Sequence, residues 1–239
     1  MKKHLLYLFI LFSIALNAQT SFKKGVEFFD AENWESAKTH FNQVESSNSY
    51  YLKAQEYLGD IAAHQKEWDE ALNFYETLVE AHPDNANYNF KYGGALGLKA
   101  LTLSKMQAAF YISDIKYYLK KAAQLDATHI ESRWALVELY MQLPGILGGS
   151  AETSYQYANQ LQNISEVDGW LAKGYIAVEE KDYNQAEAYY KNALKVGKSI
   201  TCYEKLIQLY KNKTNEKQKA AFLLKEAKEN HPQKDWSYL

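Results

Sequence analysis

The sequence predicts an all-α fold of about six helical hairpins that stack side by side, and three observations support this. Residue types recur 34 positions apart, which indicates one helix–turn–helix unit used repeatedly. Small residues hold positions where two antiparallel helices would touch, and larger residues there would push the helices apart. Pro83 ends a predicted helix, because proline donates no amide hydrogen and restricts the residue before it. The recurring sets are Gly25, Gly59 and Gly93; Trp34 and Trp68; Ala37 and Ala71; Phe41 and Tyr75; Ala186 and Ala220; and Ala193 and Ala227.

The first element, residues 1–18, has the three-part layout of a secretory signal peptide. The chain starts with two lysines after Met1, residues 5–16 are apolar and uncharged, and Ala18 is a small residue at a cleavage point. The apolar run is shorter than the roughly 20 residues that span a bilayer, and an uncleaved membrane anchor is the alternative interpretation. The sequence therefore predicts export to the periplasm or the cell exterior. Since the only cysteine is Cys202, lipid attachment directly after the signal is excluded.

Four stretches then carry the pattern of a hairpin most clearly, at about 18–51, 52–85, 167–200 and 201–232. In the second stretch, Lys66 to Glu70 form a turn and the start of the second helix, and large apolar residues fill the space between hairpins. The positions that define the pattern are Gly25, Phe28, Trp34, Ala37 and Phe41; Leu58, Gly59, Trp68, Ala71, Tyr75, Leu78 and Pro83; Trp170, Gly174, Tyr183, Ala186, Tyr190 and Ala193; and Leu206, Tyr210, Ala220, Leu224, Ala227 and Pro232.

These residues resemble the tetratricopeptide repeat family, whose pattern is Trp-x2-Leu-Gly-x2-Tyr, then Ala-x3-Phe, Ala and Pro. The resemblance covers nearly all of residues 19–239. It implies a right-handed α-solenoid of about six such hairpins in one domain, of the exported bacterial type given the predicted signal. It implies little about function, because these repeats serve many unrelated partners.

Two stretches depart from the pattern. The third hairpin, about 86–129, has ten extra residues without proline, and we expect extended helices that project beyond the stack. The fourth, about 130–166, has a long turn at 144–150, Pro-Gly-Ile-Leu-Gly-Gly-Ser. A phosphate-binding loop would need Gly-Lys-Ser/Thr, which is missing. We therefore expect a structural or partner-contact turn in which Ser150 caps the next helix and Glu152 enters its first turn.

Composition and spacing argue against catalysis, metal binding and nucleic-acid binding. The net charge is −2, and Arg133 is the single arginine among 27 basic residues, whereas proteins that read nucleic acids rely on arginine forks. After the signal, no two histidines are three or four residues apart, so no helical metal pair is predicted. No Gly-x-Ser-x-Gly elbow occurs, and Cys202 is expected to be a small buried residue. Gly93-Gly94-Ala95-Leu96-Gly97 fits close helix packing and lacks the strand of a dinucleotide fingerprint. We expect no enzyme, cofactor or metal.

The resemblance implies that first helices of successive hairpins line a concave face where partner segments bind. Its groove positions, transferred one at a time, are Phe22, Phe29, Glu56, Asp60, Phe90, Trp134, Glu138 and Tyr175. This mixture is aromatic and acidic, so it predicts a protein or peptide partner with basic and apolar side chains. The asparagine that a carboxylate clamp needs after the family glycine is absent, which argues against capture of acidic C-terminal tails. The main hypothesis is thus a non-catalytic interaction scaffold.

The insertion supports a second hypothesis. Residues 96–118 are dense in leucine, methionine, phenylalanine and tyrosine, with few charges. Either these side chains pack inside the stack, or they form an exposed apolar ridge that docks a partner or a membrane surface. In the second case the chain is a structural subunit of an envelope assembly that docks through residues 96–118.

Overall fold

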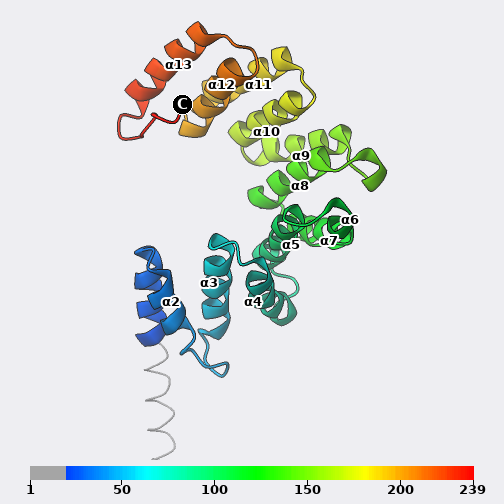
Figure 1. Cartoon of the computed structure of the whole chain (residues 1–239). Coiled ribbons are helices and arrows are strands. Elements are labelled where there is room, and N and C mark those ends of the chain that lie inside the picture. The colour runs from blue at the N-terminus through cyan, green and yellow to red at the C-terminus, as the bar shows by residue number, and fades with distance from the viewer. Residues whose placement is uncertain (1–19) are drawn as a thin grey trace, which may run out of the picture. The chain divides into compact units, whose positions relative to one another are not determined.

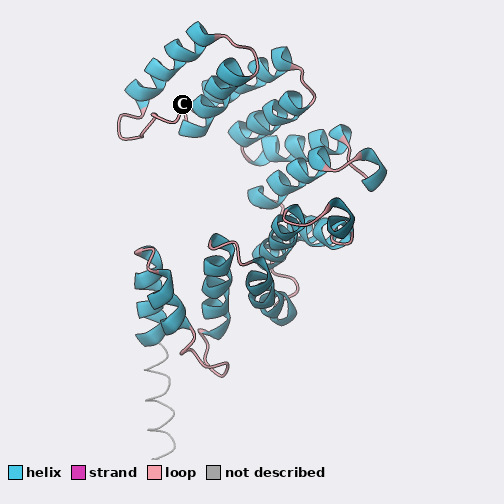
Figure 2. Cartoon of the chain, in the orientation of Figure 1, coloured by secondary structure: helices cyan, strands magenta, loops and turns pink. Residues whose placement is uncertain are grey.

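The computed structural model describes residues 20–239, and Figures 1 and 2 show this part of the chain. The predicted signal peptide lies outside the described residues. Within them every regular element is a helix and no strand occurs, so the prediction of an all-α fold is confirmed. The chain divides into two compact units between Leu125 and Asp126.

The first unit is a series of helices in which sequence neighbours pack against each other. After a helix over residues 20–30, the elements are α2 (Trp34–Phe41), α3 (Tyr51–His64), α4 (Trp68–Ala81), α5 (Ala86–Leu101), α6 (Lys105–Ala109) and α7 (Ile112–Leu125). Helix α3 packs on α4, α4 on α5, and α5 on α7. Pro83 lies just beyond the end of α4, as predicted.

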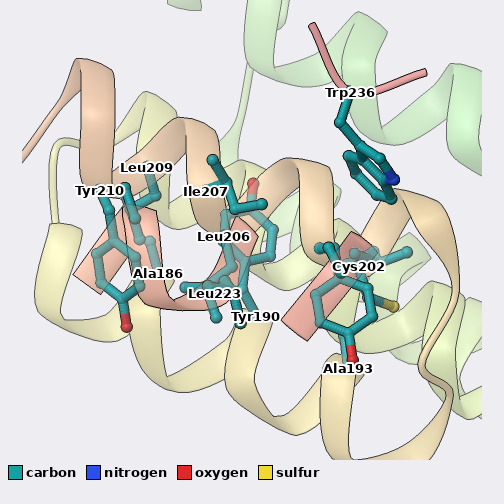
Figure 3. Packing of buried hydrophobic residues seen from close by; sticks show 14 of the residues in the cluster. Ala186, Tyr190, Ala193, Cys202, Leu206, Ile207, Leu209, Tyr210, Leu223 and Trp236 are labelled. Carbon is teal, nitrogen blue, oxygen red and sulfur yellow. The ribbon is translucent and has the colours of Figure 1, made fainter. Parts of the chain in front are cut away.

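The second unit has the same construction. Its elements are α8 (Ile130–Gln142), the 3₁₀ helix η1 (Gly145–Leu147), α9 (Ala151–Ile164), α10 (Glu166–Glu179), α11 (Tyr183–Val196), α12 (Ile200–Asn212) and α13 (Lys217–Asn230). Helix α10 contacts both α8 and α12, so the first helices of successive hairpins are neighbours. The C-terminal segment folds back on α12, and Figure 3 shows Trp236 beside this helix near Cys202 and Ile207.

The glycines of the 34-residue pattern lie where two helices of one hairpin meet. A Cβ atom on Gly25 would lie 2.6 Å from the Phe41 ring, and one on Gly59 would lie 2.4 Å from the Tyr75 ring. On Gly174 it would lie 2.2 Å from the Tyr190 ring. The glycine thus makes room for the aromatic ring 16 residues later, which confirms the packing role that the sequence predicts.

The turns between paired helices repeat a left-handed residue that sequence reasoning missed. Lys66 and Lys181 have φ of 61° and 63°, and Glu32 and Asn215 have φ of 55° and 56°. At the first two turns the following amide donates to the carbonyl five positions earlier, from Glu67 N to the Ala62 carbonyl and from Asp182 N to the Ala177 carbonyl. This is the Schellman arrangement at a helix C-terminus. The sequence did not predict these left-handed turns because none of the four positions holds glycine, the residue that usually marks such a turn.

The insertion in the third hairpin corrects the expectation of extended helices. Helix α5 has 16 residues, and α7 keeps the 14 residues found in α3 and α4. The remaining extra residues form the separate helix α6. Ser104 begins α6 with a capping box, in which its side chain accepts from Gln107 N while the Gln107 side chain accepts from Ser104 N. A strong N-cap at this position starts a new helix and so prevents continuous extension.

The long turn of the fourth hairpin is tightly organised. Pro144 O accepts from both Leu147 N and Gly149 N, and Gly148 adopts a φ of 83°. A Cβ on Gly149 would lie 1.7 Å from the Leu143 carbonyl oxygen, so only glycine fits there. The Ser150 side chain accepts from Thr153 N, and Glu152 lies in the first turn of α9, both as predicted.

Candidate functional site

In the first unit, one lysine joins two of the predicted acidic residues. Lys91 Nζ on α5 lies 2.7 Å from Glu56 Oε1 and 2.7 Å from Asp60 Oδ2, both on α3. The Asn87 amide donates to Glu56 Oε1 at 2.9 Å, and the Tyr75 hydroxyl donates to Asp60 Oδ1 at 2.8 Å. The two carboxylates are therefore half-buried and hydrogen-bonded within the chain, and Lys91 balances one of their two negative charges. The sequence analysis did not identify Lys91 as a partner of these carboxylates. Its separation of 31 residues from Asp60, close to the 34-residue repeat, is the signal that it lies on the corresponding helix of the next hairpin.

The predicted aromatic residues of the first unit contribute to packing. The Phe22 ring stacks on Tyr50 at 4.9 Å between centroids. Phe29 meets Tyr57 edge-on at 4.8 Å and Trp34 at 5.3 Å. Both are half-buried around the core of the first hairpin, and Phe90 is half-buried on α5. Core packing accounts for these contacts, and a binding role for them stays a prediction.

In the second unit, α8 and α10 bring the other three predicted residues onto neighbouring helices. The Trp134 indole donates from Nε1 to Asp168 Oδ1 at 2.8 Å, and Asp168 Oδ2 accepts from the Ser165 hydroxyl. Trp134 is half-buried against two core clusters, so it fixes α8 to α10. Tyr175 is half-buried on α10, whereas Glu138 is exposed on α8.

The electrostatics of this face centre on Glu138. Displacement of water by surrounding protein raises the pKa of the Glu138 carboxyl, and the positive charge of Lys205 on α12 partly offsets this. Burial also raises the pKa of Tyr175, the hydrogen bond with Gln142 acts in the opposite direction, and the charges of Glu179 and Glu138 raise it further. The charge of Glu138 therefore acts on the pKa of the Tyr175 hydroxyl. Among residues 20–239, no ion pair is formed by Glu138 within 4.0 Å.

The inserted segment leaves an apolar surface exposed. We name Leu98, Leu101, Met106 and Phe110 the α5–α6 patch; their exposed fractions are 47%, 70%, 79% and 80%. Leu96 and Ile115 of the same segment are buried at 6% and 3%. The insertion thus splits between the two interpretations that its sequence allows: part of it packs inside the first unit and part faces solvent.

A cleft of about 480 Å³ lies among α11, α12 and α13 and was not predicted. Its walls include Leu194, Leu206 and Phe222, with Lys191 and Lys219 at the edge. Both lysines bind Glu187, at 2.6 and 3.3 Å, so their charges are already paired.

Side chains that could bind a metal ion are not clustered in the part of the chain that the structure describes. Within residues 20–239, no three histidine, cysteine or carboxylate side chains are placed to hold a metal ion. Cys202 is fully buried, as predicted, with its Sγ 3.2 Å from Ser199 Oγ. His129 caps α8 by accepting a hydrogen bond from Ser132 N.

Comparisons with known proteins agree with this architecture. Residues 22–96 match the model of the tetratricopeptide repeat. The fold resembles that of TTC0263, a thermophilic tetratricopeptide repeat protein of Thermus thermophilus, with a TM-score of 0.63, 15% identity, and coverage of 81% of this chain and 97% of that one. A tetratricopeptide repeat protein from Parabacteroides merdae gives a TM-score of 0.64, 16% identity, and coverage of 88% and 78%. No curated protein sequence matches.

The chain folds as a tetratricopeptide repeat protein. A further structural relative is YrrB, described as a tetratricopeptide repeat protein with an unusual peptide-binding site, with a TM-score of 0.52, 12% identity, and coverage of 76% and 87%. The repeat pattern extends beyond the matched residues, because Gly174 and Tyr190 repeat the contact of Gly59 and Tyr75. In the described part of this repeat protein, no helix is long and apolar enough to cross a bilayer.

Proposed function

We propose that this repeat protein is an exported, non-catalytic scaffold that binds a segment of a partner polypeptide on the α8–α10–α12 face. The tetratricopeptide fold supports a role in protein–protein interaction. The proposed location, in the periplasm or outside the cell, depends on the predicted signal at residues 1–18.

The observation that carries the proposal is the state of Glu138. Glu138 as a whole residue is exposed, but protein atoms around its carboxyl group displace water, and its charge influences Tyr175 on the neighbouring helix. A carboxylate in such surroundings gains more from a cationic partner than one in open water, since the local dielectric constant is lower. The half-buried rings of Trp134 and Tyr175 supply apolar contact area close by. The preferred ligand is therefore an extended or helical segment that carries a lysine or arginine next to an apolar residue.

The first unit offers a weaker version of the same chemistry. Glu56 and Asp60 were predicted to attract cations, but both already bind Lys91. A basic ligand would have to displace this lysine. We therefore assign the first contact with the partner to the second unit. YrrB, which has a related fold, is described as having an unusual peptide-binding site, and this supports a peptide ligand for the present fold.

Peptide binding to Glu138→Gln tests the site. Short peptides with a basic residue beside an aromatic residue, and matched peptides with acidic residues, are titrated by fluorescence anisotropy at several salt concentrations. Wild type should prefer the basic peptides, and Glu138→Gln should weaken that binding about tenfold. Glu152→Gln, an exposed glutamate on α9, is the matched control. Equal affinity of wild type and Glu138→Gln for the basic peptides would refute the assignment. N-terminal sequencing of exported protein tests the cleavage after Ala18.

A second candidate function is that of a subunit in an envelope assembly, docked through residues 96–118. The exposure of Leu101, Met106 and Phe110 favours it, because large apolar side chains that face solvent close together in the chain are typical of interaction sites. Fractionation of cells that express a Met106→Ser/Phe110→Ser variant tests it. Release of the variant from the envelope fraction, with Phe222→Ser retained there, supports the second candidate.

A further inference from the structure

The α5–α6 patch is built from side chains that the fold leaves largely exposed. Helix α6 contains no buried residue, although its capping box holds it in a defined place. Leu101 ends α5, Met106 lies on α6, and Phe110 is the residue that closes α6. All three therefore lie at the connection between α5 and α7, which contains the helix labelled α6 in Figure 1. An ordered connection that presents three large apolar side chains to solvent is suited to contact with another apolar phase.

The charges around the patch have one sign. Residues 85–113 contain no aspartate or glutamate and three lysines, Lys91, Lys99 and Lys105. Lys91 and Lys99 bind carboxylates of α3 and α4, while no ion pair within 4.0 Å is found for Lys105 among the described residues. Residues 96–118 carry three lysines and one aspartate, a net charge of +2 in a chain whose total is −2. Lys105 is therefore the lysine beside the patch for which no carboxylate lies within 4.0 Å among the described residues, and the segment as a whole carries a net positive charge.

We propose that the α5–α6 patch docks onto an anionic lipid surface. This inference rests on the second candidate function and names what the patch contacts. Leucine, methionine and phenylalanine side chains can enter the boundary between headgroups and acyl chains while lysines stay among the lipid phosphates. Each lysine near an anionic surface adds attraction that salt weakens. The contact is peripheral, with the helices remaining outside the bilayer core.

Two other occupants fit less well. A second copy of the chain docked through the same patch would bring like charges together, because residues 96–118 are net positive. Protein interfaces concentrate their energy in tryptophan, tyrosine and arginine. The patch contains none of these, and the chain has a single arginine, Arg133, in the other unit.

Vesicle co-sedimentation of the full chain tests the proposal. Vesicles of phosphatidylcholine alone are compared with vesicles that also contain phosphatidylglycerol. Met106→Ser/Phe110→Ser should lower the partition coefficient on the anionic vesicles about tenfold, and Lys105→Glu should lower it about fivefold at low salt. Phe222→Ser is the matched control, since Phe222 is also exposed but lies in the other unit. Circular dichroism verifies that each variant is folded.

A second measurement reads the patch independently of any other membrane contact, including one made by residues 1–18. A fluorophore is attached to the Met106→Cys variant and, for comparison, to a Phe222→Cys variant; Cys202 is fully buried and stays unlabelled. Quenchers in the acyl chains of anionic vesicles should quench the label at position 106 and leave the label at position 222 bright.

The possible results distinguish docking of the patch onto lipid from docking of the patch onto a protein of the envelope. Equal binding of wild type and the double variant to anionic vesicles, or no quenching at position 106, overturns lipid docking. Equal quenching at position 106 by neutral and anionic vesicles also overturns it, because the lysines would then have no role. If vesicle binding fails while the double variant is still released from the cell envelope, the second candidate function stands with a protein at the patch.

Discussion

Alanine substitution at two neighbouring glycines of α5 separates helix packing from helix propensity. A Cβ on Gly93 would lie 2.9 Å from Tyr118 Cβ and 3.2 Å from Leu119 N, both on α7. A Cβ on Gly94 would meet nothing within 4 Å. The two positions share one helix and one hairpin, so they differ mainly in what faces them.

The expected magnitudes follow from these contacts. Alanine is favoured over glycine in a helix interior by about 1 kcal/mol, and both variants gain this. At Gly93 the new methyl group overlaps atoms close to the α7 backbone, which cannot turn aside as a side-chain tip can. Overpacking of this kind costs about 1–3 kcal/mol. Gly94→Ala should therefore raise the free energy of unfolding by about 1 kcal/mol, and Gly93→Ala should leave it unchanged or lower it by up to about 2 kcal/mol.

Urea unfolding followed by circular dichroism at 222 nm measures the difference. The Gly94→Ala midpoint should lie above that of wild type and the Gly93→Ala midpoint below that of Gly94→Ala, with similar slopes. If both variants are stabilised equally, the close approach of α5 and α7 at Gly93 is wrong. If Gly94→Ala is the less stable of the two, the assignment of open space beside it is wrong.

Three further predictions concern turns and ion pairs. Lys66→Gly should raise the free energy of unfolding by up to about 1 kcal/mol in urea melts, because a left-handed φ strains residues with a Cβ, whereas Lys66→Ala should give no gain. Lys91→Met should lower it by about 1–3 kcal/mol, because two half-buried carboxylates lose their partner; neutralising both carboxylates in the same chain should restore most of this. Although desolvation acts to raise it, the pKa of Glu187 falls below 4.5 because Lys191, Tyr210 and Lys219 donate hydrogen bonds to its carboxylate. Since the folded pKa is the lower one, this stabilisation is present above pH 4.5 and is lost as the pH falls through the folded pKa; urea midpoints of Glu187→Gln should depend less on pH in that range than those of wild type.

Much of the fold was predictable because close packing of two helices requires a small residue at a fixed position of each repeat. Gly59 and Tyr75 form one contact, and the 34-residue recurrence of such pairs shows it in the sequence. The N-cap role of Ser150 was predictable for a different reason: its hydrogen bond to Thr153 N is local and depends only on the next few residues. The form of the insertion was not predicted correctly. Its outcome depended on whether Ser104 would begin a new helix, and the total number of inserted residues does not contain that information.

The candidate site was less predictable, because ion pairs form between residues of different hairpins. Family positions located Glu56 and Asp60 on α3, but not the lysine of α5 that binds both. In the second unit they located Trp134, Glu138 and Tyr175, but not that Trp134 is engaged by Asp168 while Glu138 is exposed. Whether a predicted site residue can bind a partner depends on whether a side chain from another hairpin already binds it, and the family positions do not contain this information.

The contacts of Lys91 have a consequence for selectivity on the first unit. A tethered ammonium group competes with any visiting one at an effective concentration of roughly millimolar order or above. A ligand with a single lysine would replace the Lys91 ammonium with an equivalent ammonium group and gain little binding free energy. A guanidinium offers a planar pair of donors that an ammonium cannot reproduce. A basic ligand would therefore need arginine rather than a single lysine to displace Lys91 from Glu56 and Asp60.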